Sequence, residues 1–439
     1  MKNISFHNKK IGIWGFGIVG KSILQWLENT QCSIQILDKQ TQDHPAWIMQ
    51  TPETVQLFLE QNDYIITSPG IPIHQYQKYH HKFVCELDIF QQHFRGYSIA
   101  ITGSIGKTSI TKAIAHCTPH SIAAGNIGYP MLSALSQHTQ NEKIILELSS
   151  FQLLWSQTFA PDIALLTNFY PNHLDYHQDE DEYFSAKCTL FKYQNENQKT
   201  IVPCNLIEKI KKTVQLKSHI FLTCTQQCLS HDFSTFFIEE NNVVLANTKN
   251  EKAVIIKNID QFPFFTYQEN WIQIIAALFL QDDNTIDHIH EKLKTIAPQQ
   301  HRLEKILIHQ ETTFYNDSKS TVWQATKAAL QKFENQPCAL FLGGVSKGTD
   351  RTPLIQFLKN KPITVFAFGK EAEMLKTACD HYQIQCSSYK NLQDAVKSCL
   401  SQTLPKNVIF SPAGASFDLF EDYQERGNTF KELIFKNFR

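Results

Sequence analysis

The sequence predicts an α/β fold of three domains, spanning residues 1–96, 97–297 and 298–439. Short apolar runs that end in turn residues alternate with helix-like stretches, and this alternation restarts after Gly96 and again near Pro298. Such alternation is typical of parallel sheets covered by helices. At 439 residues the chain is also too long for one core of ordinary size.

The first domain contains the apolar runs IGIWGFG, QILDK and YIITSPG, separated by stretches such as VGKSILQWLEN. This pattern predicts a Rossmann-like parallel sheet. The turn GFGIVG, Gly15 to Gly20, has the spacing of a dinucleotide-binding loop, and Asp38 ends the following strand. Backbone N–H groups at a helix N-terminus suit a diphosphate of any nucleotide, so the motif alone does not distinguish NAD from another nucleotide.

The second domain begins with the strand YSIAIT, residues 97–102, which leads into GSIGKT and a helix starting at about Lys107. The loop is two residues shorter than the usual G-x-x-x-x-G-K-[ST] pattern. Strand, glycine loop and helix in this order nevertheless predict a P-loop ATPase-like domain. Lys107 is then expected on phosphate oxygens and Thr108 on Mg²⁺.

Polar side chains follow the next two strands of this domain. KIILEL, residues 143–148, carries Glu147, and DIALLTNF, residues 162–169, leads to His173 and Asp175. Because ligands of open α/β sheets gather at the carboxyl ends of strands, we expect these side chains near the GSIGKT loop, with Glu147 as a metal ligand.

The stretch DEDEYFSAKCTLFKY reads as a helix opened by acidic residues, with Lys187 on the face of Phe184 and Phe191. A lysine in this setting is usually a surface residue whose ammonium reaches water.

The third domain is predicted from the strand-and-turn units TTFYNDS, CALFLGG, ITVFAFG and NVIFSPAG, and we expect a second Rossmann-like sheet. The stretch from about 200 to 265 shows strand-like fragments, TIVPCN, HIFLTC and VVLAN, but no recognisable motif.

Charge and composition narrow the classes of partner. With 41 basic and 42 acidic residues and no long apolar segment, the chain favours small-molecule partners over nucleic acid or membrane. Eleven irregularly spaced cysteines fit reduced thiols, and the N-terminus lacks the apolar stretch of a secretory signal. We therefore expect a cytoplasmic protein, and a monomer.

Several further motifs occur together in one order: TGSIGKT, GNIG, ELSSFQL, TNFYPNHLDYH, Ala186-Lys187, HRLE, NDSKST, GGVSKGTD and SPAGASFDLF. This ordered set resembles the Mur ligases of peptidoglycan synthesis and spans all three predicted domains. ELSSFQL, SPG, SPAGASFD and the later ERG are most similar to the branch of the family that adds D-glutamate.

The resemblance implies ATP, UDP-N-acetylmuramoyl-L-alanine and D-glutamate as substrates, and a loop of this shortened form is normal in the family. The first domain then holds UDP in place of NAD. The implied contacts of the UDP-linked substrate are Gly15, Phe16, Gly17, Asp38, Lys39, Ser68, Pro69, Gly70 and Asn126. Those of ATP are Gly103, Ser104, Gly106, Lys107, Thr108, Ser109, Asn270, Gln273, Arg302 and Asp317.

The resemblance also implies two Mg²⁺ ions, one near Thr108 and Glu147 and one near His173 and Lys187. An ammonium beside Mg²⁺ would be repelled, so Lys187 fits this role only as a carbamate, as the family's matching lysine is. Lys107, His173 and Lys187 are the implied catalytic residues. D-Glutamate is expected beside Thr321, Lys347, Ser416, Phe417 and Tyr423.

The chain departs from the family pattern at several positions: Glu269 and Gln273 at the expected H-N-x-x-N helix start, Asn172 before His173, Val322 after Thr321, and Tyr423 where an aromatic residue, usually Phe, is expected. Since the lysines, Glu147 and His173 are retained, we expect a working enzyme with altered ATP affinity. Three alternatives stay open: a sister ligase for another amino acid, a nucleotide-binding protein without catalysis, and an NAD-dependent oxidoreductase based on GFGIVG and Asp38.

Overall fold

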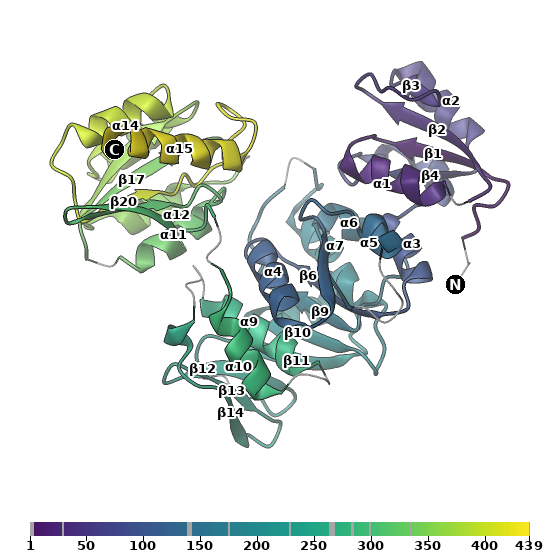
Figure 1. Cartoon of the computed structure of the whole chain (residues 1–439), viewed down its shortest axis with the longest axis horizontal. Coiled ribbons are helices and arrows are strands. Elements are labelled where there is room, and N and C mark those ends of the chain that lie inside the picture. The colour runs from purple at the N-terminus through teal and green to yellow at the C-terminus, as the bar shows by residue number, and fades with distance from the viewer. Residues whose placement is uncertain are drawn as a thin grey trace. The chain divides into compact units, whose positions relative to one another are not determined.

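The computed structural model describes residues 4–28, 30–137, 143–173, 176–227, 230–262, 268–281, 285–297, 300–333, 335–346 and 348–438. Three sheets, of five, nine and six strands, confirm the predicted α/β fold (Figure 1). The chain packs into two compact units, the first containing the first two sheets and the second containing the third. The boundaries between the three domains, placed from the sequence after residues 96 and 297, stay a prediction. No helix within the described ranges is long and apolar enough to cross a bilayer.

The first sheet is parallel and has the strand order β3-β2-β1-β4-β5. The order reverses between β1 and β4, so the loops that follow these two strands meet at the position where such sheets bind ligands. The elements are β1 (Lys10–Trp14), α1 (Ile18–Leu27), β2 (Ser33–Asp38), β3 (Trp47–Met49), α2 (Pro52–Gln61), β4 (Tyr64–Thr67), the 3₁₀ segment η1 (Ile73–Lys82), β5 (Phe83–Val84) and α3 (Glu86–His93).

The second sheet has the order β14-β13-β12-β11-β10-β9-β6-β8-β7. Its strands are β6 (Tyr97–Thr102), β7 (Ser121–Gly125), β8 (Lys143–Glu147), β9 (Ile163–Leu166), β10 (Lys199–Pro203), β11 (His219–Cys224), β12 (Ser234–Glu239), β13 (Asn242–Ala246) and β14 (Lys252–Ile256). Its helices are α4 (Lys107–Cys117), α5 (Met131–Gln137), α6 (Ser150–Leu154), α7 (Glu180–Lys192), α8 (Ile207–Thr213), α9 (Gln268–Phe279) and α10 (Ile286–Lys294), with 3₁₀ turns η2 (Cys204–Leu206) and η3 (Ile259–Gln261).

The stretch from 200 to 265, which shows no motif, extends this second sheet. Strands β10, β11 and β12 continue it in parallel, and β13 and β14 follow as antiparallel strands. The three fragments seen in the sequence correspond to β10, β11 and β13, whereas β12 and β14 were not predicted.

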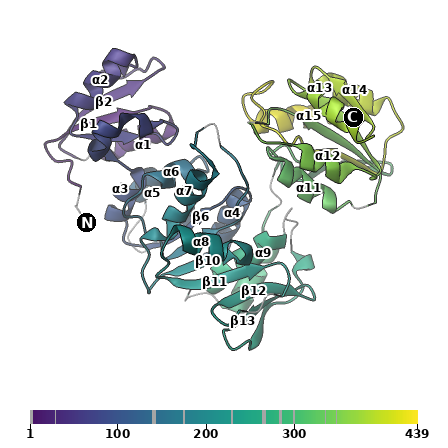
Figure 2. The ribbon, with the colours of Figure 1, turned by 180° about the vertical axis from the view of Figure 1, so that it is seen from behind.

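The third sheet has the order β15-β16-β20-β17-β18-β19, and only its β15–β16 pair is antiparallel. Figure 2 shows helices on both sides of it, and separate apolar clusters fill the two faces. The elements are β15 (Glu304–His309), β16 (Thr312–Asn316), α11 (Trp323–Gln331), β17 (Cys338–Gly343), α12 (Thr352–Leu358), β18 (Ile363–Phe368), α13 (Ala372–His381), β19 (Cys386–Tyr389), α14 (Leu392–Leu400), β20 (Asn407–Phe410) and α15 (Tyr423–Phe438).

Helix α3 is attached to the loop that follows α6 by one buried carboxylate. Asp88 accepts hydrogen bonds from the hydroxyl of Ser156 at 2.8 Å, from the amides of Gln157 and Thr158 at 3.0 and 2.9 Å, and from the Thr158 hydroxyl at 2.9 Å. Because a buried donor that loses its acceptor costs stability, this carboxylate holds the segment between the first two sheets in place.

We predict that Asp88→Ala lowers the free energy of unfolding by about 2–4 kcal/mol, because several partly buried donors lose their acceptor at once. Urea unfolding gives the free energy, and hydrogen exchange over 156–160 is expected to lose protection. Asp181→Ala is the matched control, since its side chain is 91% exposed, and a change within about 0.5 kcal/mol is expected there. Unchanged exchange in the Asp88 variant would contradict the anchoring role.

Candidate active site

The GSIGKT loop lies where β6 ends, between the ends of β8 and β9. The amide of Ser104 donates to the carbonyl of Asn168 at 3.2 Å, and the amide of Ile105 donates to the Asn168 side chain at 2.9 Å. The hydroxyl of Thr167 donates to the Ile105 carbonyl at 2.6 Å. The exit of β9 therefore holds the loop in shape.

Two glycines of this loop have no room for a side chain. Gly103 has φ +148°, and an added Cβ would lie 2.0 Å from the Thr167 hydroxyl oxygen. Gly106, in the left-handed region at φ +88°, precedes α4, and its Cβ would lie 2.9 Å from the amide oxygen of Asn270. The predicted ATP residue Asn270, on α9, is thus brought against the loop, although 164 residues separate it from Gly106 in the chain.

Two lysines donate to the same carbonyl oxygen of this loop. Lys107 Nζ lies 2.8 Å from the Gly103 oxygen and 3.3 Å from that of Ser104, and Lys187 Nζ lies 3.0 Å from the Gly103 oxygen. Lys187 is 1% exposed and lies over the ring of Tyr183. It is therefore a core residue, and the surface position common for such a lysine is excluded.

Burial is the main cause that lowers the pKa of Lys187 well below its usual value, and the neighbouring charge of Lys107 lowers it further. A lowered pKa increases the fraction of neutral amine near neutral pH, and the neutral amine is the nucleophilic form.

Glu147, at the end of β8, is the candidate metal ligand of this edge. It is 2% exposed, and one carboxylate oxygen accepts from the Asn126 side chain at 3.0 Å. The other oxygen, Oε2, is buried and has no hydrogen-bond partner in the described part of the chain. A buried carboxylate oxygen with nothing bound to it suits a divalent cation, which in nucleotide sites takes one or two carboxylates and the phosphates.

The other predicted ATP residues of the first unit lie close to the same strands. Thr108 is the second residue of α4, and Ser109 is buried behind it. Gln273 donates from its side-chain amide to the Thr167 carbonyl at 2.7 Å, while its oxygen is buried without a partner among the described residues. Gln273 therefore supports the exit of β9 together with Asn168.

In the first sheet, the GFGIVG turn and the SPG turn meet at the switch point. The hydroxyl of Ser68 donates to the Gly15 carbonyl at 3.0 Å. Asp38 accepts from the amides of Phe16 and Gln40, at 2.5 and 2.7 Å, so its carboxylate also shapes the turn itself. The remaining predicted residues here are Gly17, Lys39 and Gly70, which are exposed, and Pro69, whose carbonyl accepts from the Tyr176 hydroxyl at 3.2 Å.

In the second unit, Asp317 is an interior residue. It is 2% exposed and accepts from the Ser320 and Ser411 hydroxyls, at 2.6 and 2.7 Å, and from the Leu303 amide at 3.0 Å. Burial raises its pKa to about 6, and these hydrogen bonds and the charge of Arg302 partly offset the rise. The Asp317 carboxyl, which is expected to contact the ATP ribose, therefore makes its hydrogen bonds within its own domain and holds the surrounding loops together.

The predicted D-glutamate residues lie on the loops of the third sheet, with different exposures. Ser416 is buried, Thr321 is half-buried and Phe417 is 64% exposed. The Tyr423 ring begins α15, and Lys319 Nζ lies 3.6 Å from its centre. Lys347 and Asp175 lie outside the described residues.

Arg426, which the sequence analysis did not single out, holds these loops together. It is fully buried and donates to the Ser318 hydroxyl at 3.0 Å, the Ser318 carbonyl at 2.7 Å and the Gly414 carbonyl at 2.8 Å. Burial lowers its pKa to about 9. The ERG motif contains this arginine, but in the sequence it indicates only the family resemblance and not the burial of Arg426.

The second metal position is less defined than the first. His173 belongs to the short segment that groups with the second unit; its φ is +57° and its amide donates to the Asn172 side chain at 2.9 Å. No group of three or more His, Cys, Asp or Glu residues arranged to hold a metal occurs in the described ranges.

A family model described as the Mur ligase middle domain matches residues 101–259. The chain is 30% identical over 454 residues to the UDP-N-acetylmuramoylalanine–D-glutamate ligase of Leuconostoc mesenteroides, with 98% of each chain covered. It is 29% identical over 461 residues to the ligase of the same name from Limosilactobacillus reuteri, with 99% of this chain and 98% of the relative covered.

The fold is also that of solved Mur ligase structures. The MurF ligase of Thermotoga maritima in complex with ADP superposes with a TM-score of 0.57 at 13% identity, covering 98% of this chain and 96% of that one. At this identity the likeness concerns the fold. Together with the full-length match to the Leuconostoc mesenteroides enzyme, it shows that the chain belongs to the Mur ligase family.

Proposed function

We propose that the protein is the ATP-dependent ligase that adds D-glutamate to UDP-N-acetylmuramoyl-L-alanine in peptidoglycan precursor synthesis. The observation that carries the proposal is the full-length match to relatives of that name, with every expected catalytic residue type retained. The glycine loop and Glu147, at the ends of the neighbouring strands β6 and β8, and the buried Lys187 of α7 are suited to phosphoryl transfer.

The reaction must replace a poor leaving group. Transfer of the γ-phosphoryl group of ATP to the substrate carboxylate gives an acyl phosphate and ADP. The amine of D-glutamate then attacks the carbonyl carbon, the bond to phosphate breaks, and the amide, inorganic phosphate and one proton leave. Two anions must approach each other in the first step, so the Lys107 ammonium and the loop amides have to stabilise their combined charge.

Mg²⁺ is proposed at Glu147 and Thr108, where it would neutralise phosphate charge. The unpartnered, buried Oε2 of Glu147 supports this assignment. For the second ion we propose His173 and a carbamate on Lys187. The lowered pKa of that buried amine supports it, because only a neutral amine adds to CO₂.

The other two substrates are assigned to the remaining sheets. The UDP group is proposed at the switch point of the first sheet, where the Gly15 and Ser68 turns meet. Asn126, which donates to Glu147, is proposed as a further contact of the UDP-linked substrate. D-Glutamate is proposed on the loops of the third sheet, at Thr321, Lys347, Ser416, Phe417 and Tyr423. Arg302 and Asp317 are proposed as contacts of ATP. We further propose that the enzyme works as a monomer in the cytoplasm.

Family membership leaves the NAD hypothesis without support, since the GFGIVG turn serves a UDP-linked substrate equally well. The departures at Glu269, Gln273, Asn172 and Val322 leave Lys107, Glu147 and Lys187 in place.

We predict that phosphate release requires UDP-N-acetylmuramoyl-L-alanine and D-glutamate together, because the acyl phosphate is consumed only by the correct amine. A panel of L- and D-amino acids, each with ATP and the UDP-sugar, measures this by released phosphate. Release with a different amino acid would identify a sister ligase, and no release with any would identify a protein without catalysis.

We predict a carbamate on Lys187. With ¹³C-bicarbonate, the wild-type protein is expected to show a ¹³C carbamate resonance that Lys187→Arg lacks. Lys192→Arg, on the exposed side of the same helix, serves as the control and keeps the resonance. Full activity of the wild type without this resonance would exclude the carbamate.

We predict that Gly103→Ala weakens ATP binding at least about tenfold, the equivalent of one charge-assisted hydrogen bond, because the added methyl displaces the loop from Thr167. Calorimetric titration with ATP measures it. Gly17→Ala, at a glycine with free space around it and φ −74°, is expected to bind ATP like the wild type. If the Gly103 variant bound ATP as tightly as the wild type, the proposal that this loop binds ATP would be contradicted.

A further inference from the structure

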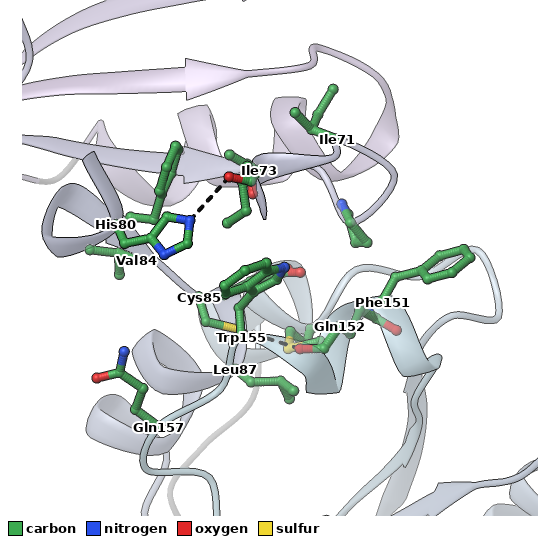
Figure 3. Close-up of a pocket in the computed structure, with 15 residues that line it drawn as sticks. Ile71, Ile73, His80, Val84, Cys85, Leu87, Phe151, Gln152, Trp155 and Gln157 are labelled. Atoms are coloured by element: carbon green, nitrogen blue, oxygen red, sulfur yellow. Dashed lines mark hydrogen bonds between the residues drawn. The ribbon is translucent and has the colours of Figure 1, made fainter. Parts of the chain in front are cut away.

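A cavity of about 110 Å³ lies in the first unit, between the connection from β4 to α3 and helix α6 (Figure 3). His80, on η1, and Trp155, just after α6, line it and contact each other edge to face, with ring centres 5.1 Å apart. The Cys85 thiol closes one side by donating to the Gln152 carbonyl at 3.4 Å. Neither the proposed phosphate loop nor Glu147 lines this cavity.

Most of the wall is apolar or aromatic. The larger contributors are Ile71, Ile73, Leu87, Met131, Phe151 and Trp155. A dry cavity of about 150 Å³ in another protein is known to bind benzene. The present cavity is smaller, at about 110 Å³, so it suits at most a single small ring or a short branched chain. The wall alone therefore selects a small hydrocarbon group.

One strongly polar group breaks this apolar surface. Glu86, the first residue of α3, lines the cavity and is 6% exposed. Neither of its carboxylate oxygens has a hydrogen-bond partner of ordinary geometry in the described part of the chain. Burial raises the pKa of Glu86 to about 7, and the nearby Leu132 amide offsets only part of the rise.

Among the described residues that line the cavity, no lysine or arginine pairs with this carboxylate. Of the other titratable groups that face it, the His80 ring lies 3.2 Å from the Ile73 carbonyl and the Cys85 thiol donates to Gln152. A buried carboxylate is stabilised by a partner that supplies positive charge and N–H donors.

We propose that this cavity is a binding site for a small apolar amine, whose ring or branched chain fills the apolar part and whose ammonium group binds Glu86. The aromatic rings around it favour the same ligand, since ammonium groups are attracted to aromatic faces. Pro69, a proposed contact of the UDP-linked substrate, also lines the cavity, whereas Glu86, His80 and Met131 have no role in the proposed chemistry.

The test uses the full-length protein and three isosteric probes of different charge: benzylamine, benzyl alcohol and benzoate. Calorimetric titration near pH 8 is expected to give saturable binding of benzylamine, at least tenfold tighter than benzyl alcohol, and no binding of benzoate. In protein labelled at the methionine methyls, the Met131 signal is expected to shift on binding. Equal affinity for benzylamine and benzyl alcohol, or no saturable binding, would overturn the proposal.

Glu86→Gln isolates the contribution of the carboxylate. Benzylamine is expected to bind this variant at least tenfold more weakly, while its binding of benzyl alcohol stays the same and shows that the cavity is still formed. Glu196→Gln, at an exposed glutamate, is the matched control and is expected to bind benzylamine like the wild type. Displacement of benzylamine by UDP-N-acetylmuramoyl-L-alanine would assign the cavity to the substrate site and overturn the proposal.

Discussion

The arrangement of the candidate active site depends on one constraint: β6, β8 and β9 run parallel as neighbours, so all three end at the same edge of the second sheet. That edge receives the glycine loop, Glu147 and the Asn168 side chain from three separate parts of the chain. The Gly103 carbonyl accepts from both Lys107 and Lys187, so both side-chain nitrogens lie at this edge of the sheet. The Lys107 ammonium supplies the positive charge that two anionic substrates need in order to approach each other. Without this shared edge, none of these residues would suggest a site.

In the second unit, buried charged side chains organise the loops at the end of the third sheet. Asp317 and Arg426 are ionisable residues, yet both are buried, and their hydrogen bonds go to the loops around them. These contacts hold in place the loops that carry the predicted D-glutamate residues Thr321 and Ser416. Their loss would leave buried partners unsatisfied, so they contribute to stability and to the shape of the site together.

The positions of strands and loops along the chain were predictable from the sequence wherever an apolar run ended in a motif. The strands before GFGIVG, GSIGKT and NDSKST are examples, because period and turn residues are local signals. The burial of Lys187 was not predictable, since its partner Gly103 lies 84 residues away in the chain. The burial of the Asp317 and Glu86 carboxyls was not predictable either. Strands β12 and β14 were missed because they carry no motif and are defined by their pairing with neighbouring strands. Long-range contacts decide these features, and local patterns do not report them.

The central claim is that this strand edge activates a carboxylate by phosphoryl transfer. The most direct measurement uses UDP-N-acetylmuramoyl-L-alanine labelled with ¹⁸O in its carboxylate, with ATP and D-glutamate. Breakdown of an acyl phosphate leaves one carboxylate oxygen on phosphorus, so the account predicts one ¹⁸O atom in each phosphate released. Phosphate without ¹⁸O, formed together with the amide product, would contradict it.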